Sequence, residues 1–285
     1  MLKFLLENNK KNRSLKFSKT KRCLPALNAS GRIGFELIGD IAIIEKPSKA
    51  EALKVMEKNK RVKTVFGKKS ARKGVFRTRK LVWLAGEKKS LTMHVENGCK
   101  FLVDVKKDYF SSRLSFERAR IGGLVKKNEN TLVLFAGVGP FAVLCAKKGG
   151  NVTAVELNPH AFKYLKENAE LNKVKINCVL GDAFKEIKKL GPSADRILLP
   201  LPFGSDDFIP EVIKNAKKGS VIHYYTHSSF RNEKKEKIEP FKDVMETIKK
   251  ACEKENVKCK ILFKRVVGGY SPNVRRVVVD IKILK

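Results

Sequence analysis

The chain has 285 residues, of which 42% are hydrophobic, enough for one large domain or two modest domains with a true core. Its 62 Lys and Arg residues against 29 Asp and Glu residues give a net charge of +33, which favours a polyanionic partner, above all nucleic acid. The sequence shows no run of 18 apolar residues and no apolar leader, so we expect a cytoplasmic protein without a membrane span.

Two stretches concentrate the positive charge. Residues 10–22 and 68–73 are rich in Lys and Arg and contain no carboxylate. Lysines on solvated helix faces explain part of the overall excess but explain this clustering poorly. Because the basic runs lack an apolar face, the pattern favours nucleic acid over a membrane surface.

The six cysteines show no CxxC pair and no spacing with histidine that suits zinc. Reduced, buried thiols are therefore the simplest interpretation. We expect no metal site.

The first part of the chain predicts a basic arm over residues 1–30 and a small α/β RNA-binding domain over residues 31–104. Ser48 followed by Glu51 is a capping-box pattern, which predicts the start of a helix. The expected strands are 33–37, 41–45, 62–66, 91–95 and 99–104, and the expected helices are 48–59 and 114–122.

Over residues 105–285 strands and helices alternate, which predicts a parallel, doubly wound sheet. The last two strands follow each other with a turn at Gly268-Gly269, which predicts a closing antiparallel hairpin. This order is typical of the Rossmann-like, class I S-adenosylmethionine-dependent methyltransferase fold. The expected strands are 131–135, 151–155, 177–180, 195–199, 219–225, 258–267 and 274–283, and the helices are 140–148, 159–171, 183–189, 206–216 and 239–254.

A glycine turn joins the strand ending at Phe135 to the next helix and contains Gly137 and Gly139. Glycine lets the backbone approach a ligand closely. Glu156 follows Gly137 by 19 residues, a spacing that suits a ribose diol, and Asp182 ends the next strand, where it can meet an adenine edge. No Lys-Ser/Thr pair follows the turn, which excludes a P-loop. The pattern favours an adenosine without a triphosphate, and S-adenosylmethionine fits best.

The segment 104–121 mixes aromatic and charged residues just before the glycine-turn strand. Arg113, Glu117 and Arg120 lie about one helical turn apart. From this spacing alone, ion pairs that support the helix are a simpler interpretation than chemistry.

Several segments, in order, resemble the archaeal and eukaryotic tRNA (guanine-N1)-methyltransferases, which modify guanosine 37 beside the anticodon. The resemblance covers about residues 31–285. The superfamily also contains methyltransferases and aminocarboxypropyltransferases of wyosine synthesis, and Arg113 favours the methyltransferase branch. The segments that carry the resemblance are 74–79, 84–87, 92–98, 104–121, 135–141, 158–161 and 221–225.

The resemblance implies roles for individual residues. Glu117 matches the general base that removes the N1 proton of guanine, and Arg77 matches the arginine that stabilises charge on O6. Arg113, Pro200 and Tyr109 match substrate-binding positions. The implied S-adenosylmethionine site contains Tyr109, Phe135, Gly137, Gly139, Glu156, Leu157, Asp182, Leu199 and Leu201.

The sequence departs from the family in three places. Pro200 stands where the family has an asparagine that contacts guanine; a proline side chain offers no hydrogen bond, which leaves the backbone carbonyl of Pro200 or Leu199 as the acceptor. Val133 replaces an aspartate before the glycine turn. A basic arm of about 30 residues precedes the shared region, where relatives often carry a further tRNA-binding domain, so we expect only unspecific phosphate contacts from it.

We therefore predict a monomeric, S-adenosylmethionine-dependent enzyme that methylates N1 of guanosine 37 in the anticodon stem-loop of tRNA. A wyosine-pathway enzyme acting on the same nucleotide, by methyl or aminocarboxypropyl transfer, is the first alternative. A non-catalytic RNA-binding relative is the second.

Overall fold

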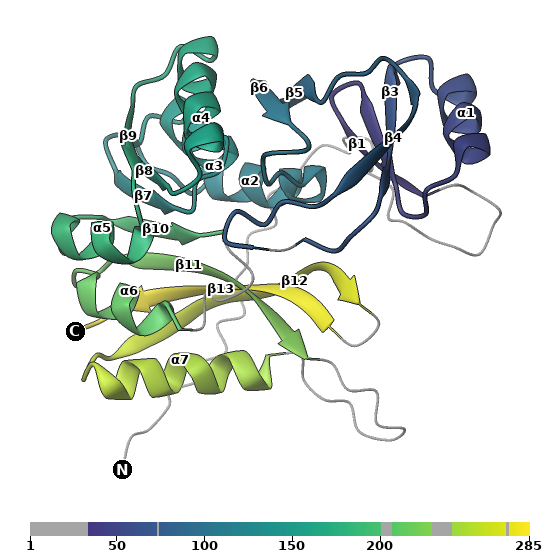
Figure 1. Ribbon diagram of the computed structural model, residues 1–285. Coiled ribbons are helices and arrows are strands. Elements are labelled where there is room, and N and C mark those ends of the chain that lie inside the picture. Colours follow the sequence, from purple (N-terminus) through teal and green to yellow (C-terminus); the bar gives the residue numbers. More distant parts are fainter. Residues whose placement is uncertain (1–33, 73, 201–206, 230–240, 272–273) are drawn as a thin grey trace, which may run out of the picture.

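The computed structural model describes residues 34–72, 74–200, 207–229, 241–271 and 274–285 (Figure 1). The predicted basic arm and Leu201 lie outside these residues. Within them the strands form sheets of four, two and seven strands. No helix in this part of the chain is both long and apolar enough to cross a membrane.

The four-stranded sheet has the order β1-β2-β3-β4, and helix α1 packs on it. Helix α1 begins where the capping pattern predicts, because the Ser48 hydroxyl accepts a hydrogen bond from the Glu51 amide at 3.2 Å. The sequence does not predict β4, because this strand lacks regular alternation and its Trp83 is 37% exposed. The elements are β1 (Phe35–Ile38), β2 (Ile41–Ile44), α1 (Lys49–Lys58), β3 (Thr64–Lys68) and β4 (Leu81–Gly86).

A two-stranded hairpin, β5 (Leu91–Glu96) and β6 (Cys99–Asp104), bridges the two larger sheets. On one side, the Asp40 amide donates to the Thr92 hydroxyl at 3.1 Å. On the other side, the Asn168 side chain bonds both the amide and the carbonyl of Leu102, at 2.7 and 3.1 Å. A short 3₁₀ helix η1 (Ser112–Leu114) and helix α2 (Ser115–Gly122) then lead into the large sheet.

The seven-stranded sheet has the order β12-β13-β11-β10-β7-β8-β9. Strands β11, β10, β7, β8 and β9 pair in parallel, and β13 pairs antiparallel with both β11 and β12. The predicted doubly wound sheet with a closing hairpin is therefore confirmed. Its strands are β7 (Asn130–Leu134), β8 (Asn151–Glu156), β9 (Ile176–Leu180), β10 (Arg196–Leu199), β11 (Val221–Ser229), β12 (Cys259–Ser271) and β13 (Val274–Ile283).

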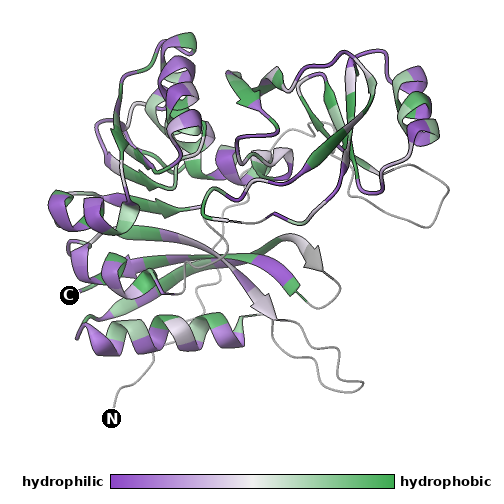
Figure 2. Ribbon diagram, viewed as in Figure 1, coloured by the Kyte–Doolittle hydropathy of each residue, from purple (hydrophilic) through white to green (hydrophobic). Residues whose placement is uncertain are grey.

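Helices cover both faces of this sheet (Figure 1). One core layer joins the sheet to α5, α6 and α7, and another joins it to α2, α3 and α4. Figure 2 shows the corresponding pattern, with hydrophobic strands and an alternation of polar and apolar residues along α7. The helices are α3 (Pro140–Lys147), α4 (Pro159–Leu171), α5 (Ala183–Leu190), α6 (Ile209–Asn215) and α7 (Lys242–Lys254).

The closing hairpin differs from the prediction at its turn. Gly268 and Gly269 lie inside β12, paired with Arg276 and Arg275, and β12 continues to Ser271. Glycines mark β-bulges as well as turns, and the register of β12 shifts on both sides of this pair. The strand order reverses between β7 and β10, which is where open α/β sheets bind their ligands.

Candidate active site

The glycine turn follows β7 at this switch point. Phe135, Gly137 and Gly139 all have positive φ, at 54°, 58° and 87°. A Cβ atom on Gly139 would lie only 2.6 Å from Leu165 Cδ1, so a side chain there would force the buried Leu165 side chain to shift. The Ala136 amide donates to the Val155 carbonyl at 2.9 Å, which holds the turn close to the end of β8.

Glu156 ends β8 and ties the turn to the sheet. Its Oε2 accepts a hydrogen bond from the Gly137 amide at 2.6 Å, and its Oε1 accepts one from the Asn158 amide at 2.7 Å. Burial raises the pKa of Glu156 above its ordinary value, although the amide hydrogen bonds act in the opposite direction. Each oxygen keeps a lone pair that can accept a ribose hydroxyl.

Apolar side chains lie exposed at the adjoining strand ends. Leu157 is 37% exposed, Leu180 50% and Phe184 39%. Glu156 and Leu180 are register partners on β8 and β9, so these residues share one edge of the sheet. An exposed apolar edge beside the Glu156 carboxylate has the character that the face of an adenine ring requires.

Asp182 serves first as the N-cap of α5. Its Oδ1 accepts hydrogen bonds from the Phe184 amide at 2.7 Å and the Lys185 amide at 3.3 Å. Leu180 and Phe184, which the sequence analysis did not select, lie on either side of it. Their only signal in the sequence is an apolar residue next to a polar cap, which is too common to point to a site.

Tyr109 lies across the glycine turn. Its carbonyl oxygen is 3.5 Å from the position that a Cβ atom on Gly137 would take. The guanidinium of Arg72 lies 4.2 Å from the Tyr109 ring centroid, and Arg72 Nη2 donates to the Phe110 carbonyl at 2.9 Å. Burial lowers the pKa of Arg72 to about 10. The loop before β4 is therefore attached to the turn through Tyr109.

Arg77 lies in that loop, half-buried, with a φ of 51°. Neighbouring Arg72 and Arg79 line a small cavity together with Asp108 and Phe110. Arg113 lies on η1 with its side chain exposed.

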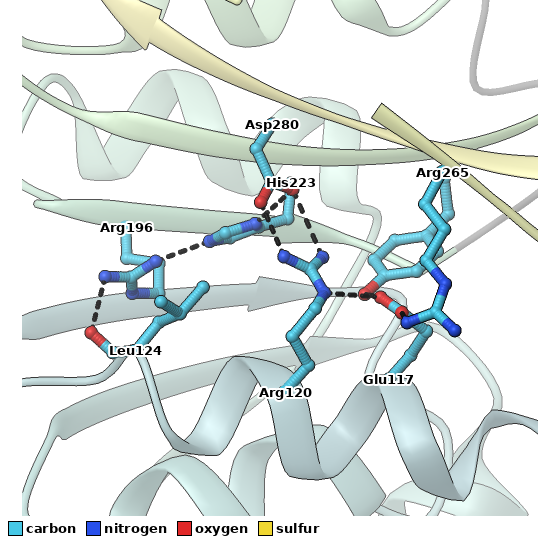
Figure 3. Close-up of polar contacts among 8 residues, drawn as sticks. Glu117, Arg120, Leu124, Arg196, His223, Arg265 and Asp280 are labelled. Carbon is cyan, nitrogen blue, oxygen red and sulfur yellow. Dashed lines mark hydrogen bonds and ion pairs between the residues drawn. The ribbon is translucent and has the colours of Figure 1, made fainter. Parts of the chain in front are cut away.

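Glu117 is buried on α2, with 2% of its surface exposed (Figure 3). Its Oε2 accepts hydrogen bonds from Arg120 Nε at 2.9 Å and from the Tyr225 hydroxyl at 3.1 Å. Its Oε1 is also buried, but within the described part of the chain it has no hydrogen-bond partner, and Arg265 Nη1 lies 3.9 Å away. Burial raises the pKa of Tyr225, and the Glu117 charge adds to the effect, so the phenol stays protonated and donates.

A chain of hydrogen bonds and ion pairs connects Arg120 through Asp280 and His223 to Arg196 (Figure 3). Arg120 reaches both oxygens of Asp280, at 2.6 and 3.3 Å, and Asp280 Oδ1 lies 2.6 Å from His223 Nδ1. Because the guanidinium of Arg196 can only donate, His223 Nε2 must accept from it, which places the imidazole proton on Nδ1. Burial lowers the pKa of His223, in keeping with a neutral ring.

Burial acts to raise the pKa of Asp280, but hydrogen bonds from His223 and Arg120 outweigh it and hold the pKa below its ordinary value. Asp280 therefore stays ionised and fixes Arg120. Glu117 likewise faces donors, since Arg120 and the Tyr225 hydroxyl both donate to its Oε2.

Glu117 and the glycine turn meet at Tyr225. The Tyr225 ring lies 5.6 Å from the ring of Phe141, at the start of the helix that follows the turn. The preceding residue, Tyr224, is the register partner of Leu199 at the end of β10. The structure thus brings the turn, Glu117 and the β10 end together. The Leu199 side chain is fully buried in the core, so only its backbone can face a ligand, and Pro200 follows it half-buried.

The sequence assigns no site role to Arg196, His223, Tyr225 or Asp280, although residues 221–225 carry part of the family resemblance. Polar residues inside otherwise apolar strands are the available signal. Nothing in their spacing shows that β11 and β13 pass beside α2.

The sheet order, the glycine turn and the carboxylate at the end of β8 define a class I S-adenosylmethionine-dependent methyltransferase. Residues 92–262 match the TRM5/TYW2 methyltransferase domain, and residues 24–89 match the TYW2 N-terminal domain. The chain belongs to the TRM5/TYW2 methyltransferase family, whose cofactor is S-adenosylmethionine.

Three relatives illustrate the range of the family. The chain is 38% identical over 256 residues, 87% of this chain and 74% of the relative, to the tRNA (guanine(37)-N(1))-methyltransferase Trm5b of Pyrococcus abyssi. It is 36% identical over 257 residues, 87% of this chain and 92% of the relative, to the tRNA 4-demethylwyosine(37)-methyltransferase Taw21 of Saccharolobus solfataricus. It also resembles the crystal structure of Methanocaldococcus jannaschii TYW2 in complex with AdoMet, with a TM-score of 0.66, 27% identity and coverage of 88% of this chain and 100% of that one.

Proposed function

We propose that this methyltransferase acts on N1 of guanosine 37 in tRNA, with Glu117 as the general base. The observation that carries the proposal is the buried Glu117 carboxylate near the glycine turn. Its Oε2 accepts two hydrogen bonds, whereas its Oε1 has no hydrogen-bond partner among the described residues. Guanine N1 carries a proton at neutral pH, so its attack on an electrophilic methyl group requires a base.

S-adenosylmethionine, when bound at the turn, supplies that methyl group. Glu156 and the apolar edge at Leu157 would hold its adenosine part, and Tyr109 would cover the turn. Arg120 and Tyr225 hold Glu117 Oε2, so Oε1 accepts the N1 proton. Negative charge then grows on guanine O6, and Arg77 is the proposed residue that stabilises it.

Substrate contacts follow from the remaining positions. Arg113, exposed on η1 just before α2, would contact the nucleotide. The carbonyl of Pro200 or Leu199 would accept a hydrogen bond in place of the missing asparagine. The net charge of +33 suits the phosphates of tRNA. Residues 31–104 would hold the RNA and residues 105–285 the cofactor. A monomeric state and a cytoplasmic location stay predictions.

A wyosine-pathway activity on the same nucleotide is the second candidate. Pro200, where the guanine-reading asparagine is expected, favours it, because a changed contact suits a changed base. The similarity to Taw21, itself a 4-demethylwyosine methyltransferase, points the same way.

The test is methyl transfer from labelled S-adenosylmethionine to two unmodified tRNA transcripts that differ only in carrying guanosine or adenosine at position 37. The proposal expects N1-methylguanosine, identified by nucleoside mass, from the first transcript alone. Product only from a tRNA carrying 4-demethylwyosine would establish the second candidate. If the protein binds cofactor but transfers neither a methyl nor an aminocarboxypropyl group to any of the three tRNAs (guanosine 37, adenosine 37 or 4-demethylwyosine 37), both candidates are contradicted.

A further inference from the structure

Two phenylalanine rings lie exposed next to Glu117. Phe116 on α2 is 57% exposed, and Phe263 on β12 is 37% exposed. An arginine packs against each ring: Arg265 lies 4.3 Å from the Phe116 centroid, and Arg120 lies 4.5 Å from the Phe263 centroid. Aromatic and guanidinium groups therefore alternate across the junction of the two elements. We call Phe116, Phe263 and Arg265 the aromatic platform.

The platform borders the proposed base. Arg265 is 44% exposed and its Nη1 lies 3.9 Å from Glu117 Oε1, the oxygen proposed to take the proton (Figure 3). A nucleotide with its N1 at Oε1 would lie beside Arg265, so the nucleotides joined to it in the RNA chain would reach the neighbouring surface.

The chemistry of the platform suits single-stranded RNA. Exposed rings provide faces on which bases stack, and arginine binds phosphate and stacks as well. Strand β12 carries Lys260, Lys264 and Arg265 and contains no acidic residue. A polyanion is therefore the complementary occupant of this edge.

A second copy of the chain fits the same edge poorly. Strand β12 is the edge of the seven-stranded sheet, and its register shifts between Ile261 and Phe263 and again between Val266 and Gly268. Bulges and lysines on an edge strand oppose pairing with another strand.

We propose that the aromatic platform binds a nucleotide adjacent to the target guanosine, whose base stacks on the exposed face of Phe116 while its phosphate contacts Arg265. This inference rests on the proposed function, because it takes Glu117 as the point that the target base reaches. Stacking on the platform would hold the RNA strand open and support the flipped position of the target base.

The experiment is a double-mutant cycle between the protein and the RNA. The Kd for tRNA is measured for the wild type and for Phe116→Leu. Each protein is tested with intact tRNA and with tRNA carrying an abasic nucleotide at position 36 or at position 38. Phe116→Leu should raise the Kd for intact tRNA roughly tenfold, the size of one lost stack. One of the two abasic tRNAs should bind the wild type with the same loss and show no further loss with Phe116→Leu.

Two further variants complete the design. Phe116→Trp should restore binding, because its ring also stacks. Leu171→Ala, an exposed apolar residue on α4 away from β12 in Figure 1, should leave the Kd unchanged. Cofactor binding and melting temperature serve as folding controls.

The platform would be overturned if the effects of Phe116→Leu and of the abasic nucleotide on the Kd were additive for both abasic tRNAs. An unchanged Kd for Phe116→Leu would also overturn it, even if the wild type methylates guanosine 37. Loss of a dimer in Phe116→Leu would also overturn it, in favour of a contact between copies. The proposed function fails separately, if the wild type binds tRNA but transfers no methyl group.

Discussion

Helix α2 carries two neighbouring charged residues whose surroundings differ. Arg118 pairs with Glu96, which comes from the end of β5, while Glu117 pairs with Arg120 and Tyr225. Both carboxylates are buried. Glu96, however, has partners on both oxygens, since Arg118 donates to each and His94 Nε2 lies 3.2 Å from Oε2.

We call Arg118 and Glu96 the closed pair, because other groups of the protein occupy the polar atoms of both, and we call Glu117 the open carboxylate. The Arg118 guanidinium also donates to the Ser111 carbonyl at 3.0 Å and lies 5.1 Å from the Phe110 ring centroid. His94 Nδ1 accepts from the Gly39 amide, which links the pair to the four-stranded sheet. A buried carboxylate with every acceptor used holds elements together, whereas one with a buried acceptor left over can take a proton from a substrate.

The largest expected effect comes from removing the open carboxylate. Glu117→Gln keeps the shape of the side chain but cannot accept a proton as a base, so kcat for methyl transfer should fall by roughly 10² to 10⁴-fold. Cofactor affinity, measured by calorimetry, should stay within about twofold because the adenosine residues are untouched. Full activity in Glu117→Gln would remove the proposed role.

Opening the closed pair should instead reduce stability. Glu96→Gln leaves Arg118 buried without a counter-charge, and breaking such a pair costs about 3–5 kcal/mol of unfolding free energy. Urea denaturation measures the loss, and transfer assays below the melting transition should retain most of the wild-type kcat. A stable Glu96→Gln protein with no activity would place Glu96 in the chemistry and erase the contrast.

Acid should lower the free energy of unfolding by protonating Glu96 of the closed pair. Burial acts to raise the pKa of Glu96, but hydrogen bonds from His94 and Arg118 outweigh it and hold the pKa below its ordinary value of 4.5. A lowered folded-state pKa means stability that is present above pH 4.5 and is lost as the pH falls through the folded-state value. The free energy of unfolding should therefore drop below this pH, and less steeply in Glu96→Gln. Equal slopes for the two proteins would show that other groups control acid unfolding.

The smallest expected effect comes from removing the hydrogen bond between Tyr225 and Glu117. Tyr225→Phe removes one hydrogen bond to Glu117 Oε2, worth about 1 kcal/mol, so kcat should fall roughly fivefold. Tyr164→Phe on α4 is the matched control and should leave kcat unchanged. A Tyr225→Phe enzyme with the wild-type kcat would contradict the proposed support of Glu117 by Tyr225.

The sequence predicts the fold well where periodicity is strong, as in the alternating strands and helices after Asn130. It fails at β4, which has no regular alternation, and at Gly268-Gly269, where glycines form part of a bulged strand instead of a turn. The first error arises because β4 depends on its pairing with β3, which lies earlier in the chain, and the second because glycine marks β-bulges as well as turns.

In the site, too, the sequence predicts contacts within a local unit but not contacts that depend on tertiary packing. The contact between Gly137 and Glu156 is predictable because a strand–turn–helix unit fixes it locally. The ion pair between Glu117 and Arg120, favoured from spacing, is present as well. That Glu117 also meets Tyr225 depends on how α2 packs on β11, which no local pattern encodes.

The most direct test of the central claim is the single-turnover rate of methyl transfer to tRNA bearing guanosine 37, measured for the wild type and Glu117→Gln with cofactor and tRNA both saturating. We predict that Glu117→Gln transfers the methyl group roughly 10² to 10⁴-fold more slowly than the wild type, although it binds cofactor and tRNA equally well. Equal single-turnover rates for the two proteins would contradict the assignment of Glu117 as the base.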